Sequence, residues 1–473
     1  MGTIASSGST IVTAKTGRFR RRIALGVIAL VLVLVGGGIA LAGGLGGDDE
    51  TASGETVTVP DAVLPELGDA TPVLASLDSA APAPAPAALS TVLGPLLRAP
   101  ALGSGVSAEV VDVETGEVLL DLDADSPAVP ASTAKLLTAT AALTALDPAQ
   151  TLATTVVAGT APGEVVLVGG GDPTLSRTSP SQIYPGAPTV ADLAAQVVAA
   201  LPAGTSVTRV VVDSSLFTGP LTAQGWGPAD APSNYAAPVT ATAVDGARVS
   251  SRSQARSGQP GIDAGVALAD ALGAPTATVV LGEAPDGAKT LAEVRSAPIA
   301  RLVEQALSMS DNVLAEALAR QVAISRDQPA SFEGAAEAVV GALADAGVDT
   351  GGVTLSDGSG LSRLDQVPAG VLTELVAGSA DGSLPDASAL LSGLPVAGYD
   401  GTLFDRGNAA TAPGVVRAKT GTLLGVHALA GTAVTLEGRL LAFAVIADES
   451  GSEAGAEAAL DDVAAALAAC GCR

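Results

Sequence analysis

The sequence predicts an α/β protein of the α+β type, in which helices flank an antiparallel sheet and a β-rich inserted domain interrupts the chain. Three observations predict this architecture. Strand-like alternation of apolar residues stands near both ends of the chain, at 107–122 and at 415–447. Helical spacing of apolar residues stands at 299–323 and at 332–346. Between 156 and 290, short β-rich runs alternate with Gly/Pro loops, which indicates a separate, mostly β segment.

Local signals support the main elements in chain order. A turn signal at 114–116 joins two apolar runs into a hairpin. The Ala/Leu-rich run that follows Pro130 predicts a helix that ends near Pro148. A second turn signal at 437–438 joins two C-terminal strands, and the Ala-rich run 453–469 predicts a helix that covers one face of the sheet.

The chain divides into a main domain, formed by 91–155 and 291–473, and an inserted domain at 156–290. Residues 46–90 are rich in Pro, Ala, Gly and Asp, which is typical of a semi-rigid spacer. The Gly-Gly-Gly-Asp-Pro run at 169–173 follows a predicted strand and could cradle a phosphate. We interpret it as a tight structural turn, because the Asp-Pro continuation and the acidic chain disfavour a phosphate.

Composition restricts the core and the partners. Apolar residues make up 48% of the 473 positions but aromatic residues only 2%, so the core is built mainly from Ala, Val and Leu. The net charge of −26 argues against nucleic acid as a partner, because phosphates would be repelled. Two cysteines and one histidine do not form a metal-site pattern, and we predict no metal and no cofactor.

The N-terminal region predicts contact with a membrane. Residues 1–22 form a basic tail, and residues 23–45 are apolar or glycine throughout, which is long enough to span a bilayer. The basic side stays inside, so the rest of the chain would lie outside a cell membrane that it crosses once. A cleaved signal peptide is the alternative, because Ala40-Leu41-Ala42 fits the small-residue cleavage pattern, and the protein would then be secreted.

Both cysteines, Cys470 and Cys472, stand at the C-terminal end. An exported protein permits a disulfide bond. A bridge across one residue would close a tight ring, and the sequence leaves open whether it forms.

The pair Ser132 and Lys135 is the first candidate for chemistry. In a helix, positions three apart share a face, so the hydroxyl and the amine would lie one turn apart. A serine hydroxyl needs a base before it becomes a nucleophile. Lys135 can be that base when it is neutral, a state that burial and a second cation, Lys419, would favour. The alternative is that Ser132 only caps a helix and Lys135 is a surface charge.

Two further short motifs carry complementary groups. In Ser310-Asp311-Asn312, Ser310 would complete a proton relay between Lys135 and a leaving group, and Asn312 would offer a donor and an acceptor to a substrate amide. We expect Asp311 to be a capping or solvated acid rather than a base.

The third motif, Lys419-Thr420-Gly421, suits an edge strand that faces a site. Lys419 would bind a substrate carboxylate, Thr420 and Thr422 would supply hydroxyls, and Gly421 would let the substrate backbone approach closely. The backbone N–H groups of Ser132 and Thr422 are the candidates for the oxyanion site.

Each of these motifs alone has a structural alternative: a helix cap for the second and a hairpin turn for the third. Lys15-Thr16-Gly17 in the basic tail shows that the third pattern also arises without function. We expect His427, the only histidine, to be a strand residue rather than a catalytic one. All three motifs occur in order, and together they predict one shared site.

With these motifs the chain resembles the low-molecular-mass class C penicillin-binding proteins, the D-alanyl-D-alanine carboxypeptidase/endopeptidase family (peptidase family S13). The resemblance runs from about residue 90 to the C-terminus and includes the long insertion between the first two motifs. The further matching segments are 169–175, Trp226, 235–238, 310–316, 357–362 and 419–423.

The resemblance implies a transpeptidase domain like that of penicillin-binding proteins and serine β-lactamases. It implies that Ser132 is acylated by a peptidoglycan stem peptide ending in D-Ala-D-Ala, that the terminal D-alanine leaves, and that water hydrolyses the acyl-enzyme. Some members also cut cross-links as endopeptidases, and β-lactams would inhibit by acylating the same serine. His427 departs from the family, in which a small residue such as serine is expected.

Two alternatives stay open: a serine β-lactamase on the same scaffold and a non-catalytic wall-binding relative. A class A lactamase would need a Glu-x-x-Leu-Asn motif, which none of the three asparagines provides. A class C-like lactamase would need Tyr-x-Asn, which Tyr184, Tyr235 and Tyr399 do not provide. Only the intact set of chemical groups speaks against the non-catalytic relative.

Overall fold

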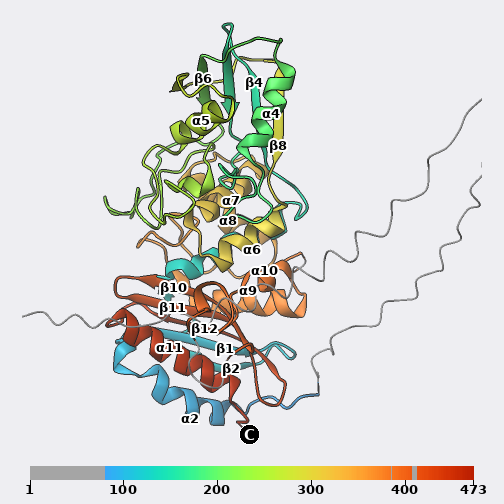
Figure 1. Cartoon of the computed structure of the whole chain (residues 1–473). Coiled ribbons are helices and arrows are strands. Elements are labelled where there is room, and N and C mark those ends of the chain that lie inside the picture. The colour runs from blue at the N-terminus through green and yellow to red at the C-terminus, as the bar shows by residue number, and fades with distance from the viewer. Residues whose placement is uncertain (1–79, 385, 407–412, 473) are drawn as a thin grey trace, which may run out of the picture. The chain divides into compact units, whose positions relative to one another are not determined.

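A five-stranded antiparallel sheet forms the frame of the main domain (Figure 1). The structure is a computed structural model that describes residues 80–384, 386–406 and 413–472. The strand order is β10-β11-β12-β1-β2, so β1 from the start of the domain pairs directly with the C-terminal strand β12, and β2 lies at the sheet edge beside β1. The strands are β1 (Val106–Asp112), β2 (Val118–Leu122), β10 (Val416–Leu423), β11 (Val426–Val434) and β12 (Leu440–Ala447).

Helices cover both faces of this sheet. Because successive side chains of a strand point to opposite faces, neighbours on β12 belong to different cores. Phe443 packs into the core with α2 (Pro86–Leu97) and α11 (Glu453–Ala468). Ala444 packs into the core with the helices on the other face, among them α9 (Ala369–Asp381). The flanked antiparallel sheet of the prediction is confirmed, including the C-terminal helix.

Helix α2 corrects the predicted end of the spacer. The composition of residues 46–90 predicts an extended linker, but the helix begins at Pro86. Proline suits the first turn of a helix, where its missing N–H is not needed. Three leucines at intervals of four residues, Leu89, Leu93 and Leu97, are buried on the helix face that contacts the sheet. The predicted basic tail, apolar segment and remaining linker lie outside the described residues.

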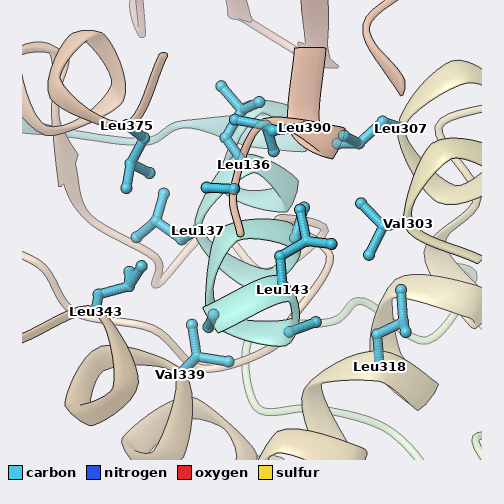
Figure 2. Packing of buried hydrophobic residues seen from close by; sticks show 14 of the residues in the cluster. Leu136, Leu137, Leu143, Val303, Leu307, Leu318, Val339, Leu343, Leu375 and Leu390 are labelled. Atoms are coloured by element: carbon cyan, nitrogen blue, oxygen red, sulfur yellow. The ribbon is translucent and has the colours of Figure 1, made fainter. Parts of the chain in front are cut away.

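Helix α3 (Lys135–Ala145) is the centre of the helical core (Figure 2). Its residues 135–143 are all buried, which is typical of a helix enclosed on every side. Figure 2 shows its leucines among labelled side chains that come from other helices, with which they share one buried cluster. These helices are α6 (Ile299–Ser308), α7 (Asn312–Ser325), α8 (Phe332–Asp345), α9 and α10 (Ala389–Gly393).

The inserted segment contains a second five-stranded sheet of order β7-β6-β5-β4-β8. Its strands are β4 (Ala153–Ala158), β5 (Glu164–Val168), β6 (Arg209–Asp213), β7 (Thr278–Leu281) and β8 (Thr290–Arg295). The pairs β5–β6 and β6–β7 are parallel, which requires crossover connections. Helices α4 (Val190–Ala200) and α5 (Pro260–Ala271) lie in these connections and pack on one face.

The predicted limits of the inserted domain, 156 and 290, fall within or at the start of strands of this sheet. The sheet itself extends from Ala153 to Arg295, and the segment between these residues also contains the helices α4 and α5. The smaller elements are the two-stranded pair β3 (Pro127–Ala128) with β9 (Val367–Pro368) and the 3₁₀ helices η1 (Pro100–Leu102), η2 (Ala131–Ala134), η3 (Asp245–Ala247) and η4 (Gly401–Leu403).

The Gly-Gly-Gly-Asp-Pro run is a structural turn, as interpreted from the sequence. A Cβ atom on Gly170 would overlap the carbonyl oxygen of Ala153. The Gly170 carbonyl accepts a hydrogen bond from Gln321 Nε2 at 3.0 Å, which connects this turn to α7. Asp172 accepts from the amide of Thr174 at 2.8 Å and so closes the turn. This turn joins the inserted sheet to the helical core.

Cys470 and Cys472 form a disulfide bond, which answers the question that the sequence leaves open. The carbonyl oxygen of Cys472 accepts a hydrogen bond from the amide of Ala85 at 2.7 Å. The end of the chain is therefore attached to the residue that precedes α2. No helix in the described part of the chain combines the length and the apolar character that crossing a membrane requires.

We predict that Gly170→Ala destabilises the protein by about 1–3 kcal/mol, because the added methyl group meets backbone that cannot move independently. Gly258→Ala is the matched control, since the nearest atom to its new Cβ would be Pro232 Cγ at an ordinary 3.5 Å. Chemical denaturation of both variants measures the free energy of unfolding. Equal stability of the two variants would contradict the proposed packing.

Candidate active site

Ser132 and Lys135 lie where the predicted helix begins, but the serine is on a 3₁₀ turn and not in the first turn of the α-helix. The turn η2 contains Ser132, and Lys135 is the first residue of α3. In a 3₁₀ helix the side chains at i and i+3 eclipse each other. Lys135 Nζ lies 2.9 Å from Ser132 Oγ, which confirms the predicted contact between amine and hydroxyl.

Two glycines hold the turn that carries Ser132. A Cβ atom on Gly360 would overlap the carbonyl oxygen of Ala131, and one on Gly421 would lie 2.8 Å from the carbonyl oxygen of Pro130. Ala131 itself adopts a φ of 47°, a left-handed conformation that is strained for alanine. Gly421 is therefore required by the packing of the protein on itself, and its predicted contact with substrate stays a prediction.

The Lys135 amine is enclosed by three oxygen atoms. Besides Ser132 Oγ, it lies 2.5 Å from Asn312 Oδ1 and 2.6 Å from the carbonyl oxygen of Ser359. The last two oxygens can only accept hydrogen bonds. A neutral amine has two N–H groups for these two oxygens, and its lone pair then faces the Ser132 hydroxyl. This is the arrangement that a general base for serine requires.

Burial favours the neutral form of Lys135. The side chain is 1% exposed, so the alternative interpretation as a surface charge is wrong. Burial lowers the pKa of Lys135 to about 8, even though the carboxylates of Asp357, Glu316 and Asp311 act in the opposite direction. Arg256 adds to the lowering of this pKa.

Lys419 is also fully buried. Burial, and after it the charge of Lys135, lower the pKa of Lys419 well below its usual value. The charge of Lys135 therefore acts on the pKa of Lys419, whereas the predicted effect of Lys419 on the pKa of Lys135 stays a prediction. A bound carboxylate would favour the charged form of Lys419.

The Ser310-Asp311-Asn312 motif lies in a break between two helices. The sequence predicts continuous helical structure at 299–323, but α6 ends at Ser308 and α7 begins at Asn312. Asp311 caps α7 by accepting hydrogen bonds from the amides of Val313 and Leu314. Its predicted capping role is confirmed, and the alternative of a solvated acid is wrong, because the residue is 2% exposed.

This break places the motif between the two lysines. Ser310, whose φ is 51°, accepts a hydrogen bond from Lys419 Nζ at 2.9 Å, while Asn312 contacts Lys135. Among the hydrogen bonds of the described residues, none joins Ser310 directly to Lys135. In the predicted proton relay, Ser310 therefore contacts Lys419. Transfer of a proton from Lys135 to Ser310 stays a prediction.

The third motif lies on β10, the edge strand next to η2. Thr420 Oγ1 donates to Thr402 Oγ1 of η4 at 2.9 Å, a contact that the sequence analysis does not identify. Thr422 is exposed. The structure thus brings the three motifs together, and the oxyanion role of the Ser132 and Thr422 amides stays a prediction.

A loop at 357–362 supplies site residues that motif reasoning missed. The Asp357 carboxylate accepts hydrogen bonds from the amides of Ser359 (2.9 Å), Gly360 (2.6 Å) and Ser362 (2.7 Å) and from Trp226 Nε1 (2.6 Å). These bonds turn the Ser359 carbonyl towards Lys135. The only sequence signal for this loop is its place among the segments that resemble the family.

His427 is a strand residue, as predicted. It lies on β11 opposite Thr422 and its Nδ1 is 2.7 Å from Ser450 Oγ. Burial lowers its pKa, which favours the neutral ring. Thr422 is the only motif residue it opposes, and no motif residue bonds to its ring in the described structure.

A serine hydroxyl in contact with a buried lysine amine is the arrangement expected of a serine acyl-transfer enzyme. The comparisons with known proteins agree. Residues 89–262 and 252–468 match the D-Ala-D-Ala carboxypeptidase 3 (S13) family. The chain is 41% identical to carboxypeptidase DacB of Mycolicibacterium smegmatis over 96% of this chain and 99% of that protein. It is also 41% identical to carboxypeptidase Rv3627c of Mycobacterium tuberculosis over 82% of this chain and 85% of that protein.

A solved structure shows the same fold. Penicillin binding protein 4 (dacB) of Haemophilus influenzae superposes with a TM-score of 0.64 at 22% identity, covering 80% of this chain and 98% of that one. The chain belongs to the D-Ala-D-Ala carboxypeptidase 3 (S13) family. The family and fold expected from the resemblance are confirmed.

We predict that the rate of acylation falls about tenfold for each pH unit below about 8 and levels off above it, because only the neutral Lys135 amine can accept the serine proton. The second-order rate constant for acylation by a fluorescent penicillin, measured from about pH 6 to pH 10, checks this. A rate that stays constant over this range would contradict lysine as the base.

Proposed function

We propose that the chain is a serine-type D-Ala-D-Ala carboxypeptidase that trims peptidoglycan stem peptides through an acyl-enzyme on Ser132. The observation that carries this proposal is the position of Lys135 Nζ, 2.9 Å from Ser132 Oγ and in contact with two oxygens that can only accept. Family membership gives the reaction class, and the geometry supports the residue roles proposed next.

In the first half-reaction, neutral Lys135 takes the proton of Ser132, and Oγ attacks the carbonyl carbon of the penultimate D-alanine. The ester bond forms, the peptide bond breaks, and the terminal D-alanine leaves after its nitrogen receives a proton. We propose that Ser310, whose hydroxyl accepts from Lys419, delivers that proton and takes its replacement from Lys135 through the predicted relay, which leaves Lys135 neutral again. In the second half-reaction, neutral Lys135 takes a proton from water, and the water oxygen attacks the ester carbonyl carbon. The bond between that carbon and Oγ then breaks, and Lys135 returns its proton to Ser132 Oγ.

Substrate binding follows from the groups that remain available. Asn312 Oδ1 is occupied by Lys135, so its NH₂ group is the part that would donate to a substrate carbonyl. Lys419 together with Thr420 and Thr422 would bind the terminal carboxylate. A β-lactam presents a carboxylate and a strained amide in the same relation, and we propose that it acylates the same serine as an inhibitor.

The same acyl-enzyme chemistry could instead cleave D-Ala cross-links, which would make the protein an endopeptidase rather than a carboxypeptidase. Purified muropeptides with and without cross-links, assayed side by side, separate the two activities. Release of D-alanine from a pentapeptide identifies the carboxypeptidase, whereas conversion of dimers to monomers identifies the endopeptidase.

We propose further that residues 23–45 anchor the protein in the cell membrane with the enzyme domain outside. The support is in the sequence: an apolar run long enough to span a bilayer follows a basic tail. The mass of the mature N-terminus measures this directly. Cleavage after Ala42 would instead establish a secreted protein.

We predict that Ser132→Ala abolishes labelling by a fluorescent penicillin and release of D-alanine, because it removes the atom that is acylated. Lys135→Met should lower the acylation rate by about 10²- to 10⁴-fold, the usual contribution of a general base. Lys289→Met, an exposed lysine of the inserted segment, is the control and should label normally. Labelling of the Ser132→Ala protein would contradict the mechanism, and rapid turnover of the penicillin would indicate a β-lactamase.

A further inference from the structure

The carboxylate of Asp311 accepts more hydrogen bonds than a helix cap requires. Apart from the two amides of α7, it accepts from Tyr184 Oη at 2.7 Å, Arg248 Nη2 at 3.2 Å and Arg256 Nη2 at 3.1 Å. The Asp311 side chain is 0% exposed, and those of Arg248 and Arg256 are 7% and 4% exposed. All three additional donors belong to the inserted segment, between the first and second catalytic motifs.

The loop next to these arginines has an unusual backbone conformation. Three consecutive residues of η3, Asp245, Gly246 and Ala247, have positive φ values of 52°, 62° and 62°. The Gly246 carbonyl accepts from Arg256 Nη1, and a Cβ atom on Gly246 would overlap the hydroxyl of Tyr184. Left-handed conformations cost free energy at Asp245 and Ala247, so the surrounding contacts must hold this loop in place.

Neither arginine is needed to end or begin a helix. An Asp, Ser or Asn side chain caps a helix without any cationic partner. Burying two guanidinium groups against one carboxylate is costly, and a buried ion pair is weak support for stability. The position of the carboxylate offers a better reason, because it stands between Ser310, which bonds Lys419, and Asn312, which bonds Lys135.

We propose that Tyr184, Arg248 and Arg256 form a clamp on Asp311 that positions Ser310 and Asn312 against the two lysines, so that the inserted segment is a working part of the active site. This inference rests on the proposed function. The three residues do not touch the reacting atoms and act through Asp311 as positioning residues. The unusual φ of Ser310 is the conformation that the clamp would maintain.

The charges of the clamp also reach Lys135. Arg256 lowers the pKa of Lys135, whereas Asp311 raises it. The other charged groups that act on this amine are Asp357 and Glu316, which both raise its pKa, and Lys419 lies in the same site. Removing the Arg256 charge should therefore raise the pKa of Lys135 and move the pH midpoint of acylation upward.

We predict that Arg256→Gln lowers the acylation rate constant and kcat by about ten- to a hundredfold, with a smaller change in KM, and raises the pH midpoint. Arg256→Lys should recover the midpoint, because it keeps the charge, but not the full rate. Tyr184→Phe removes one hydroxyl and keeps every charge, so it should lower the rate and leave the midpoint unchanged. Tyr184→Phe keeps the test valid should Arg256→Gln fail to fold.

Arg439→Gln is the matched control for a lost buried ion pair. Arg439 is 5% exposed and its Nη2 lies 2.8 Å from Asp112 Oδ1 in the main sheet. This variant should lose stability in thermal unfolding but keep the rate constant and pH midpoint of the folded fraction.

The inference is overturned if Arg256→Gln and Tyr184→Phe acylate at the wild-type rate, or if their loss of rate matches that of Arg439→Gln. A wild-type protein that does not react with penicillin at Ser132 would instead overturn the proposed function, so the two failures are distinguishable.

Discussion

The amine of Lys135 is held between the side-chain oxygen of Asn312 and the backbone carbonyl oxygen of Ser359, and the reactivity of the site depends on this contact. Two acceptors that have no proton of their own fix where the amine hydrogens point. Because both hydrogens of the neutral amine then point at these two oxygens, its lone pair points at the Ser132 hydroxyl. Burial in the middle of the helical core lowers the pKa of Lys135 to about 8, so a larger fraction of the amine is neutral near pH 7 than for an exposed lysine.

The elements around the site serve this one contact. The turn that carries Ser132 packs closely against two glycines. These are Gly421 of edge strand β10 and Gly360 of the loop at 357–362. The break between α6 and α7 turns Asn312 towards one lysine and Ser310 towards the other. The second motif thereby forms hydrogen bonds with each of the other two.

Sequence patterns predict those features of the structure that depend on residues close together in the chain. The i, i+3 spacing of Ser132 and Lys135 predicts their contact, and alternation of apolar residues predicts the antiparallel sheet. The break at 309–311 was not predicted, because apolar periodicity continues across it and only a buried cap separates the helices. The partners of Asp311 were not predictable either, since Arg248 and Arg256 lie 63 and 55 positions away and neither belongs to a motif.

The pairing of β1 with β12 has a consequence for how the molecule is made. The central partner of an early strand is synthesised almost last, and the amide of Ala85 bonds the carbonyl of Cys472 at the other extreme of the domain. Contacts between residues so distant in sequence form slowly, since a large loop must close first. A nascent chain that lacks its final strands has no complete main sheet beside the turn that carries Ser132, so the candidate site can form only after these strands have been synthesised.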